Sequence, residues 1–107
     1  RSRPFWRYYL DSFKKEFPQL KKASLDDWML RMNWVEPSFI RIEADEVTYG
    51  LHIILRYELE KEIVNGSIKA SDIPEIWNEK MKEYIGIVPR NDREGALQDV
   101  HWSKGYF

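Results

Sequence analysis

The spacing of apolar residues along this 107-residue chain predicts α-helices over most of its length. Residues 4–17 carry aromatic side chains at helical spacing, and Pro18 ends that run. The sequence Ser-Leu-Asp-Asp at residues 24–27 resembles a capping box and predicts a second helix that ends near Met32. Residues 33–39 are then expected to form a connector.

The strongest helical pattern covers residues 44–64. One apolar stripe runs along it, formed by Val47, Leu51, Ile54, Leu55, Leu59 and Ile63. A second apolar flank consists of Tyr49, Ile53 and Tyr57. We therefore expect this helix to be buried on more than one side. Asn65 and Gly66 carry the signal that ends a helix.

The last third of the chain predicts one long and one short helix. Ser71 or Asp72 caps the long one, Pro74 lies in its first turn, and Gly86 and Pro89 close it. Its inward side chains are expected to be Ile76, Trp77, Met81, Tyr84 and Ile85. A polar turn at residues 91–95 then leads to a short helix over residues 96–102.

Two short segments are ambiguous. Residues 68–70 could be extended, while residues 39–44 alternate like a strand yet follow a proline that could start a helix. Taken together, the pattern predicts an all-α fold, a multi-helix segment with at most a short extended stretch. Residues 1–107 are expected to form a single helical segment, a fragment of a longer domain.

Composition excludes several classes of protein. The 17 basic and 18 acidic residues are interspersed and give a net charge of −1, whereas nucleic-acid binding needs a clustered basic surface. No apolar run is long enough to span a membrane. Cysteine is absent, which removes disulfides and cysteine-based zinc sites and fits a cytoplasmic protein. We expect neither nucleic-acid nor membrane partners.

The aromatic content is high, with five Trp, six Tyr and five Phe residues. Aromatic side chains bury large areas, and a chain of this length has few surfaces on which to bury so many. We therefore expect that Trp28, Trp34, Trp77 and Trp102 are not all covered within one copy of the chain.

Two short sequences carry a family resemblance. Ile-Arg-Ile-Glu-Ala-Asp at residues 40–45 matches the pattern Ile/Val-Arg-x-x-Ala-Asp at every fixed position, and residues 46–52 continue that match. Gly-Ala-Leu-Gln-Asp-Val-His-Trp at residues 95–102 matches Gly-x-x-Gln-Asp-x-His-Trp. With both motifs in the same order, the chain resembles the carboxypeptidase Taq family, the helical zinc carboxypeptidases of bacteria and archaea.

The resemblance implies the C-terminal part of a zinc metallocarboxypeptidase, which releases C-terminal residues from peptides. Such enzymes hold zinc, or another divalent metal, through two histidines one helical turn apart and a third ligand. His52 and His101 lack that spacing. We therefore expect the metal ligands upstream of Arg1, and neither metal binding nor activity from this segment alone. The implied partners are a peptide with a free C-terminus, the remainder of the peptidase chain and a homodimer partner.

Arg41 is the main candidate for substrate binding. It lies between two isoleucines, a costly place for a guanidinium unless it meets a carboxylate. The resemblance implies that Arg41 lines the substrate groove, where a carboxypeptidase needs a group that binds the free C-terminal carboxylate. The structural alternative is that Arg41 pairs with Glu43, Asp45 or Glu46. Asp45 is assigned a supporting role, at the start of the long helix and as a residue that also orients Arg41.

His101 is the candidate catalytic residue, and Gln98 and Asp99 are candidate substrate-binding residues. Gln98 lies three and four positions before His101 and Trp102, so one helical face can hold these pairs. An imidazole can donate to a peptide carbonyl as negative charge develops on it. The resemblance implies a groove-lining or carbonyl-polarising role for His101. A structural histidine, supported by Gln98 and Asp99, is the alternative.

His52, Arg56 and Glu60 form a polar row at four-residue steps, which is typical of a solvated or inter-helix face. A rival hypothesis from another functional class treats the whole chain as a non-catalytic helical interaction module derived from the peptidase fold. The sequence upstream of Arg1 would distinguish the two hypotheses.

Overall fold

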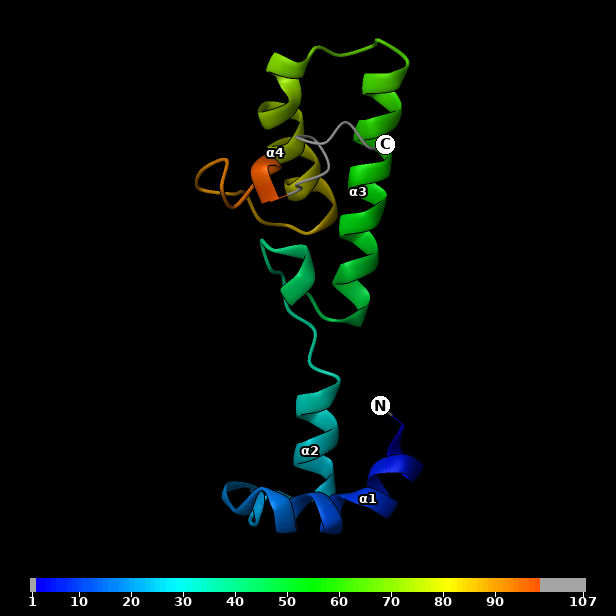
Figure 1. Ribbon diagram of the computed structural model, residues 1–107, viewed down its shortest axis with the longest axis vertical. Coiled ribbons are helices and arrows are strands. Elements are labelled where there is room, and N and C mark those ends of the chain that lie inside the picture. Colours follow the sequence, from blue (N-terminus) through cyan, green and yellow to red (C-terminus); the bar gives the residue numbers. More distant parts are fainter. Residues whose placement is uncertain (1, 99–107) are drawn as a thin grey trace. The chain divides into compact units, whose positions relative to one another are not determined.

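The computed structural model describes residues 2–98. The chain divides into two compact units, Arg1–Trp34 and Val35–Phe107 (Figure 1). The α-helices are α1 (Arg3–Glu16), α2 (Leu25–Met32), α3 (Glu46–Val64) and α4 (Ile73–Tyr84), and the 3₁₀ turns are η1 (Pro18–Leu20), η2 (Arg41–Glu43), η3 (Ala70–Asp72) and η4 (Ala96–Gln98). Residues 2–98 contain no strand, so the predicted all-α class is confirmed. That both units belong to one segment of a longer domain stays a prediction.

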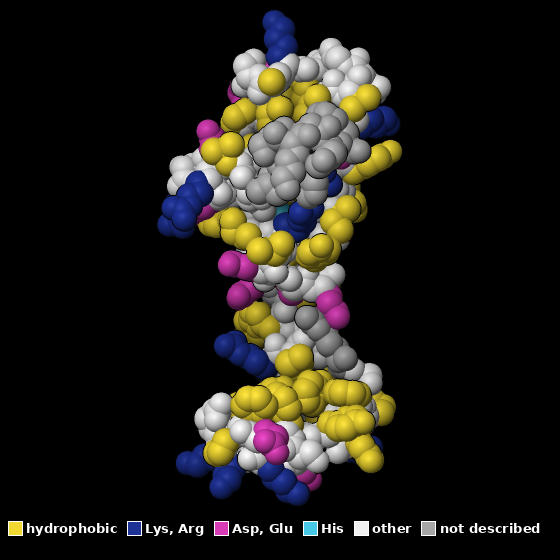
Figure 2. Space-filling model, in the orientation of Figure 1, with side chains coloured by type: hydrophobic (Ala, Val, Ile, Leu, Met, Phe, Trp, Pro, Cys, Tyr) yellow, Lys and Arg dark blue, Asp and Glu magenta, His cyan; other side chains and the backbone are white. Residues whose placement is uncertain are grey.

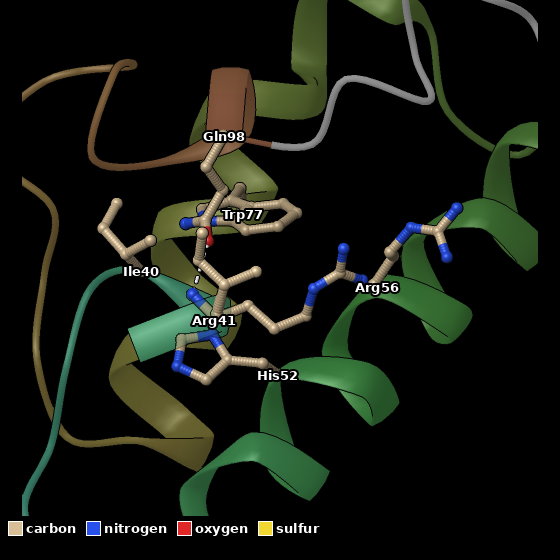
Figure 3. A pocket seen from close by; sticks show the side chains of 7 residues that line it. Ile40, Arg41, His52, Arg56, Trp77 and Gln98 are labelled. Atoms are coloured by element: carbon tan, nitrogen blue, oxygen red, sulfur yellow. Dashed lines mark hydrogen bonds between the residues drawn. The ribbon is translucent and has the colours of Figure 1, made fainter. Parts of the chain in front are cut away.

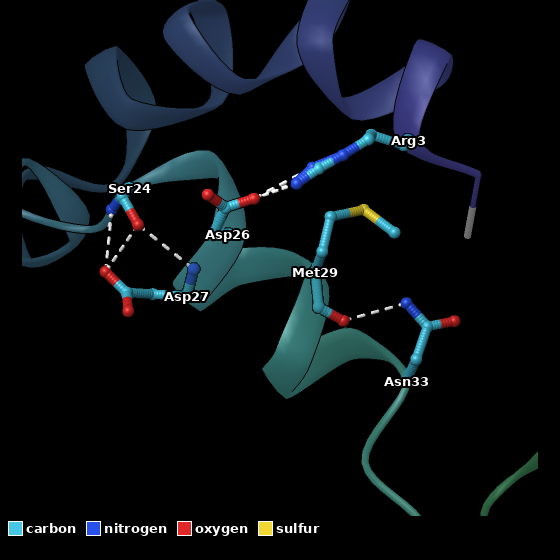
Figure 4. A network of polar contacts seen from close by, with 6 residues as sticks. All are labelled: Arg3, Ser24, Asp26, Asp27, Met29 and Asn33. Carbon is cyan, nitrogen blue, oxygen red and sulfur yellow. Dashed lines mark hydrogen bonds and ion pairs between the residues drawn. The ribbon is translucent and has the colours of Figure 1, made fainter.

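In the first unit, α1 packs against α2 through aromatic rings. The Trp28 ring lies 4.9 Å from that of Trp6 and 5.3 Å from that of Phe13, measured between centroids. Such pairs stabilise a contact beyond the area that they bury. The capping box expected at Ser24 is present, because Asp27 N donates to Ser24 Oγ over 3.0 Å and Ser24 N donates to the Asp27 carboxylate over 3.1 Å (Figure 4).

The surface of the first unit is rich in apolar side chains (Figure 2). Large apolar residues exposed there are Phe5, Tyr8, Tyr9, Phe17 and Leu30. Trp34, at the end of this unit, is 49% exposed, while Trp77 in the second unit is buried. The expectation that the tryptophans are not all covered within one copy is therefore confirmed on the described residues.

In the second unit, α3 and α4 pack side by side and enclose the core. The core consists of Leu55, Leu59, Trp77, Met81, Ile85 and Ala96. Burial of a leucine or methionine side chain contributes about 1.5–3 kcal/mol relative to exposure. The Glu58 carboxylate on α3 ties the helices together at one point, since it accepts from Lys80 Nζ over 2.9 Å and from the Tyr84 hydroxyl over 2.6 Å.

The ends of α3 and α4 follow the expected signals. Asp45 caps α3, which places the first helical residue two positions after the predicted start. Asn65 ends α3, and Gly66 takes a φ of +70°, a conformation that favours glycine. Gly86 plays the same part after α4, with a φ of +82°.

The expected burial of α3 on more than one side is wrong for the described residues. The side of α3 that meets α4 and η2 is covered, but Val47 is 59% exposed and Tyr57 is 63% exposed. Among residues 2–98, α3 packs against α4 and η2 on one side, and a helix with apolar side chains on two flanks needs neighbours on both sides to be buried.

The ambiguous segments form neither strands nor α-helices. Residues 41–43 make a single 3₁₀ turn after an extended Ile40, and residues 70–72 make another after an extended Lys69. Of the short helix expected over residues 96–102, the described part is the 3₁₀ turn η4. No helix among residues 2–98 is both long enough and apolar enough to cross a membrane.

Candidate functional site

A pocket in the second unit brings the first sequence motif next to η4. It is lined by Ile40, Arg41, Ile42, His52, Arg56, Trp77 and Gln98, and its empty volume is about 390 Å³, open solvent included. These residues come from η2, α3, α4 and η4 (Figure 3). Arg41 therefore lines a pocket, and its predicted place in a substrate groove stays a prediction.

Arg41 enters this pocket because of the short turn that carries it. Ile40 is extended and η2 then turns the chain sharply, which directs the Arg41 side chain toward α3 (Figure 3). In this view the Arg41 side chain runs between Trp77 and His52 and extends toward Arg56, which lines the same pocket. Arg41 is half-buried.

The charge of this pocket is positive. Among the described residues that line it there is no carboxylate, whereas two guanidinium groups are present. Arg56 forms an ion pair with Glu60 one turn along α3. Arg41 makes no ion pair with any residue between 2 and 98, so the predicted alternative of pairing with Glu43, Asp45 or Glu46 is not what this structure has. An unneutralised guanidinium in a recess is suited to bind a carboxylate.

His52 is 2% exposed and lies on the pocket side of α3. Neither ring nitrogen has a well-formed hydrogen bond within the described part of the chain. Burial lowers the pKa of His52 below its ordinary value, and the charge of Arg41 acts in the same direction. The Ser38 backbone and the charge of Asp45 raise that pKa, without overcoming burial. His52 is therefore neutral at pH 7 and able to donate one N–H.

Trp77 contributes a second donor to the pocket. Its side chain is 3% exposed, and among residues 2–98 its indole N–H finds no acceptor. A buried donor without a partner is costly, typically about 1–3 kcal/mol, and an acceptor on a ligand would remove that cost. Together with Arg41, His52 and Arg56, this makes a lining rich in donors and poor in acceptors.

Comparison with known proteins identifies the chain's relatives. The family model of the carboxypeptidase Taq (M32) metallopeptidases matches residues 1–107. The chain belongs to this family.

Its relatives include carboxypeptidase 1 of Bacillus subtilis, 49% identical over all of this chain and 22% of the relative's length. Thermostable carboxypeptidase 1 of Thermus thermophilus is 44% identical, again over all of the chain and 21% of the relative. A solved structure of Pyrococcus furiosus carboxypeptidase superposes with a TM-score of 0.90 at 44% identity, over 97% of this chain and 21% of the other. The chain thus spans about a fifth of the length of the carboxypeptidases that it matches.

The metal of this metallopeptidase family has no fitting ligand set in the described residues. Within residues 2–98 no group of three histidine, cysteine, aspartate or glutamate side chains lies close enough to hold an ion. His52, the one histidine described, is enclosed by Trp77 and two arginines rather than by carboxylates. Two guanidinium groups beside an imidazole repel a cation, so these residues do not fit the metal of this family.

Asp45 acts on the backbone around the pocket. Its Oδ1 accepts from Val47 N over 2.8 Å and from Thr48 N over 3.0 Å, and its Oδ2 accepts from Glu36 N over 3.1 Å. These bonds, first of all the one from Thr48, lower the pKa of Asp45 to about 2. The expected place at the start of the long helix is confirmed, but Asp45 has no direct contact of this kind with Arg41.

Gln98 lines the pocket, yet its amide is fully used within the protein. Its Oε1 accepts from Arg41 N over 2.9 Å, and its Nε2 donates to the carbonyls of Phe39 (2.8 Å) and Glu94 (3.1 Å) (Figure 3). Its predicted substrate contact stays a prediction. The predicted catalytic residue His101 and the predicted substrate-binding residue Asp99 lie outside the described residues.

Sequence reasoning gave too little weight to three residues of this pocket. Spacing alone predicts that His52 and Arg56 belong to a solvated or inter-helix row and that Trp77 belongs to the core. The sequence contains a signal for two of them, because His52 and Arg56 interrupt an otherwise apolar stretch of the helix. The tertiary position of η2 opposite that stretch, which makes the row a pocket wall, could not be derived from spacing.

Proposed function

We propose that this chain forms part of a metallocarboxypeptidase that releases C-terminal residues from peptides. In this proposal the pocket belongs to the substrate groove, and Arg41 binds the free carboxylate of the peptide's last residue. Family membership supports the reaction class. The observation that carries the assignment is that Arg41 reaches into a recess without any acidic partner among residues 2–98.

The chemistry of the pocket supports an anion rather than a cation as ligand. Arg41 offers a planar pair of donors that matches a carboxylate, while the N–H groups of Trp77 and neutral His52 add donors without adding charge. Ile40 and Ile42 supply apolar surface at its edge. The guanidinium of Arg56 adds positive potential even while Glu60 neutralises part of its charge.

The experiment compares Arg41 variants of the full-length peptidase that contains this chain, on one peptide with a free C-terminus and on its C-terminal amide. Charge-assisted hydrogen bonds contribute about 1.5–3 kcal/mol, so Arg41→Ala should lower kcat/KM on the free acid about 10- to 100-fold. Arg41→Lys should restore part of this loss, because an ammonium keeps the charge and loses the planar fork.

The amide is the control substrate. It has no carboxylate, so the wild type should process it poorly and Arg41→Ala should be little worse. An equal loss on both substrates would mean that Arg41 holds the fold and not the peptide. The rival proposal, a non-catalytic interaction module, requires instead that the full-length protein shows no peptidase activity on either substrate.

A further inference from the structure

We infer that Gln98 is a positioning residue for Arg41, not a direct substrate contact. This inference rests on the proposed role of Arg41 and adds the device that fixes its direction. Gln98 and Arg41 are 57 positions apart in the chain, yet the side-chain amide of Gln98 in η4 is bonded to the backbone of Phe39 and of Arg41, on either side of Ile40.

Two of the three hydrogen bonds of the Gln98 amide fix the backbone at the start of η2. The Arg41 backbone N–H donates to Gln98 Oε1, and the Gln98 amide nitrogen donates to the carbonyl of Phe39, two residues earlier. The amide thus pairs with the backbone as a neighbouring strand would, and Ile40 between the two bonds is held extended. Because Arg41 is the first residue of η2, this clamp sets where its side chain leaves the backbone.

Gln98 is itself held in place from its own side. Its amide nitrogen also donates to the Glu94 carbonyl within the turn that precedes η4. That turn is fixed by Glu94, whose carboxylate accepts from Arg90 Nη2 over 2.6 Å, while the Arg90 guanidinium lies 5.7 Å from the centre of the Phe39 ring. The loop before η4 and the segment before η2 are therefore linked at two points, of which the Gln98 amide is the one adjacent to Arg41.

The alternative, a direct contact of Gln98 with substrate, would need hydrogen-bonding capacity that is already used. Both amide N–H groups have acceptors, Phe39 O and Glu94 O, and the amide oxygen has the Arg41 N–H. A peptide could gain a bond to Gln98 only by breaking one of these or by using the remaining lone pair of Oε1. That lone pair is an acceptor and would repel the carboxylate that Arg41 attracts.

The inference is tested in the full-length peptidase with Gln98→Met, which keeps the length of the side chain and removes all three hydrogen bonds. The measured quantity is the ratio of kcat/KM on a free-acid peptide to that on its amide. Misplacement of the Arg41 guanidinium should lower this ratio about three- to tenfold, mainly through a higher KM for the free acid. Gln98→Glu, which loses both donors and adds a charge beside Arg41, should lower the ratio as well and serves if the first variant fails to fold.

A double-mutant cycle separates positioning from contact. With Arg41→Ala in the background there is no guanidinium left to position, so adding Gln98→Met should leave the ratio unchanged. Additive losses would overturn the inference, since Gln98 would then act on the substrate independently of Arg41. If Arg41→Ala collapses the ratio and neither Gln98 variant changes it, the proposed function stands and this inference fails. If Arg41→Ala leaves the ratio intact, the proposed function itself fails.

The matched control is Tyr84→Phe. It removes one hydrogen bond of the same unit, from the Tyr84 hydroxyl on α4 to Glu58 on α3, between residues that do not line the pocket. It should leave the ratio of the two substrates unchanged. A drop in the ratio equal to that of Gln98→Met would show that loosening of the unit in general, rather than the position of Arg41, determines the ratio, and would refute the inference.

Discussion

The burial of His52 predicts a specific loss of stability in mild acid. Burial holds its pKa below the ordinary value of about 6.5, so the unfolded chain takes up a proton at this residue before the folded chain does. The free energy of unfolding therefore falls as the pH drops below about 6.5. One proton of difference changes that free energy by about 1.4 kcal/mol per pH unit, so a step from pH 6.5 to 5.5 removes up to that amount.

The matched variant is His52→Leu, which replaces a buried ring, whose nitrogens have no hydrogen-bond partner among residues 2–98, by an apolar side chain. It should fold with little change in stability at pH 7.5, and it should lack the part of the loss between pH 7.5 and 5.5 that the protonation of His52 causes. Urea denaturation at pH 7.5, 6.5 and 5.5, followed by tryptophan fluorescence, measures both proteins. His101 is present in both and cancels in the difference. Parallel loss in the two proteins, or a flat wild type, would refute the reasoning.

Two further outcomes follow from the second unit. Leu59→Ala, at a fully buried position, should lower the free energy of unfolding by about 2–5 kcal/mol. In urea denaturation this variant should have a lower midpoint and an unchanged m-value. Ile53→Ala, at an exposed position of the same helix, should lower the midpoint far less. The Asp45 carboxylate has a pKa of about 2 in the folded protein, because its charged form accepts the hydrogen bonds at the start of α3. Asp45→Asn should keep most of the cap of α3, but it should lack the loss of stability that the wild type shows as the pH falls from about 3.9 to about 2. Acid titration of both proteins, followed by circular dichroism, tests this.

Local signals in the sequence were sufficient for the helices and for most of their ends. The capping box at Ser24, the cap at Asp45 and the glycines at 66 and 86 each fix a terminus through bonds or backbone angles that involve only neighbouring residues. Such signals can be read from the local sequence alone, because they do not depend on residues far away in the chain. The strand-or-helix ambiguity at residues 39–44 had no local solution, because the 3₁₀ turn found there depends on Gln98, 57 positions away from Arg41.

The exposed flank of α3 shows what apolar periodicity cannot predict, namely which apolar surfaces of a helix are buried. Apolar periodicity correctly indicated that this helix has more than one apolar side, but burial is a property of neighbours and not of a pattern. Within residues 2–98 the neighbours of α3 cover one side and leave Val47 and Tyr57 exposed. A pattern can therefore state which surfaces are suited to burial, while only contacts state which of them are buried in the chain at hand.

The two sequence motifs that carried the resemblance turn out to be joined by hydrogen bonds, and this changes the meaning of their polar residues. Read separately, Arg41 and Gln98 both resembled groups that face a substrate. Within residues 2–98 the Arg41 side chain lines the pocket without an ion pair, whereas the Gln98 amide makes three hydrogen bonds to backbone atoms. A half-buried amide beside a carboxylate-binding guanidinium can either touch the ligand or fix the guanidinium, because its few hydrogen-bonding positions do not suffice for both. In the role that we propose, the uncharged amide of Gln98 fixes the backbone of Arg41 without neutralising the charge that would attract a peptide carboxylate.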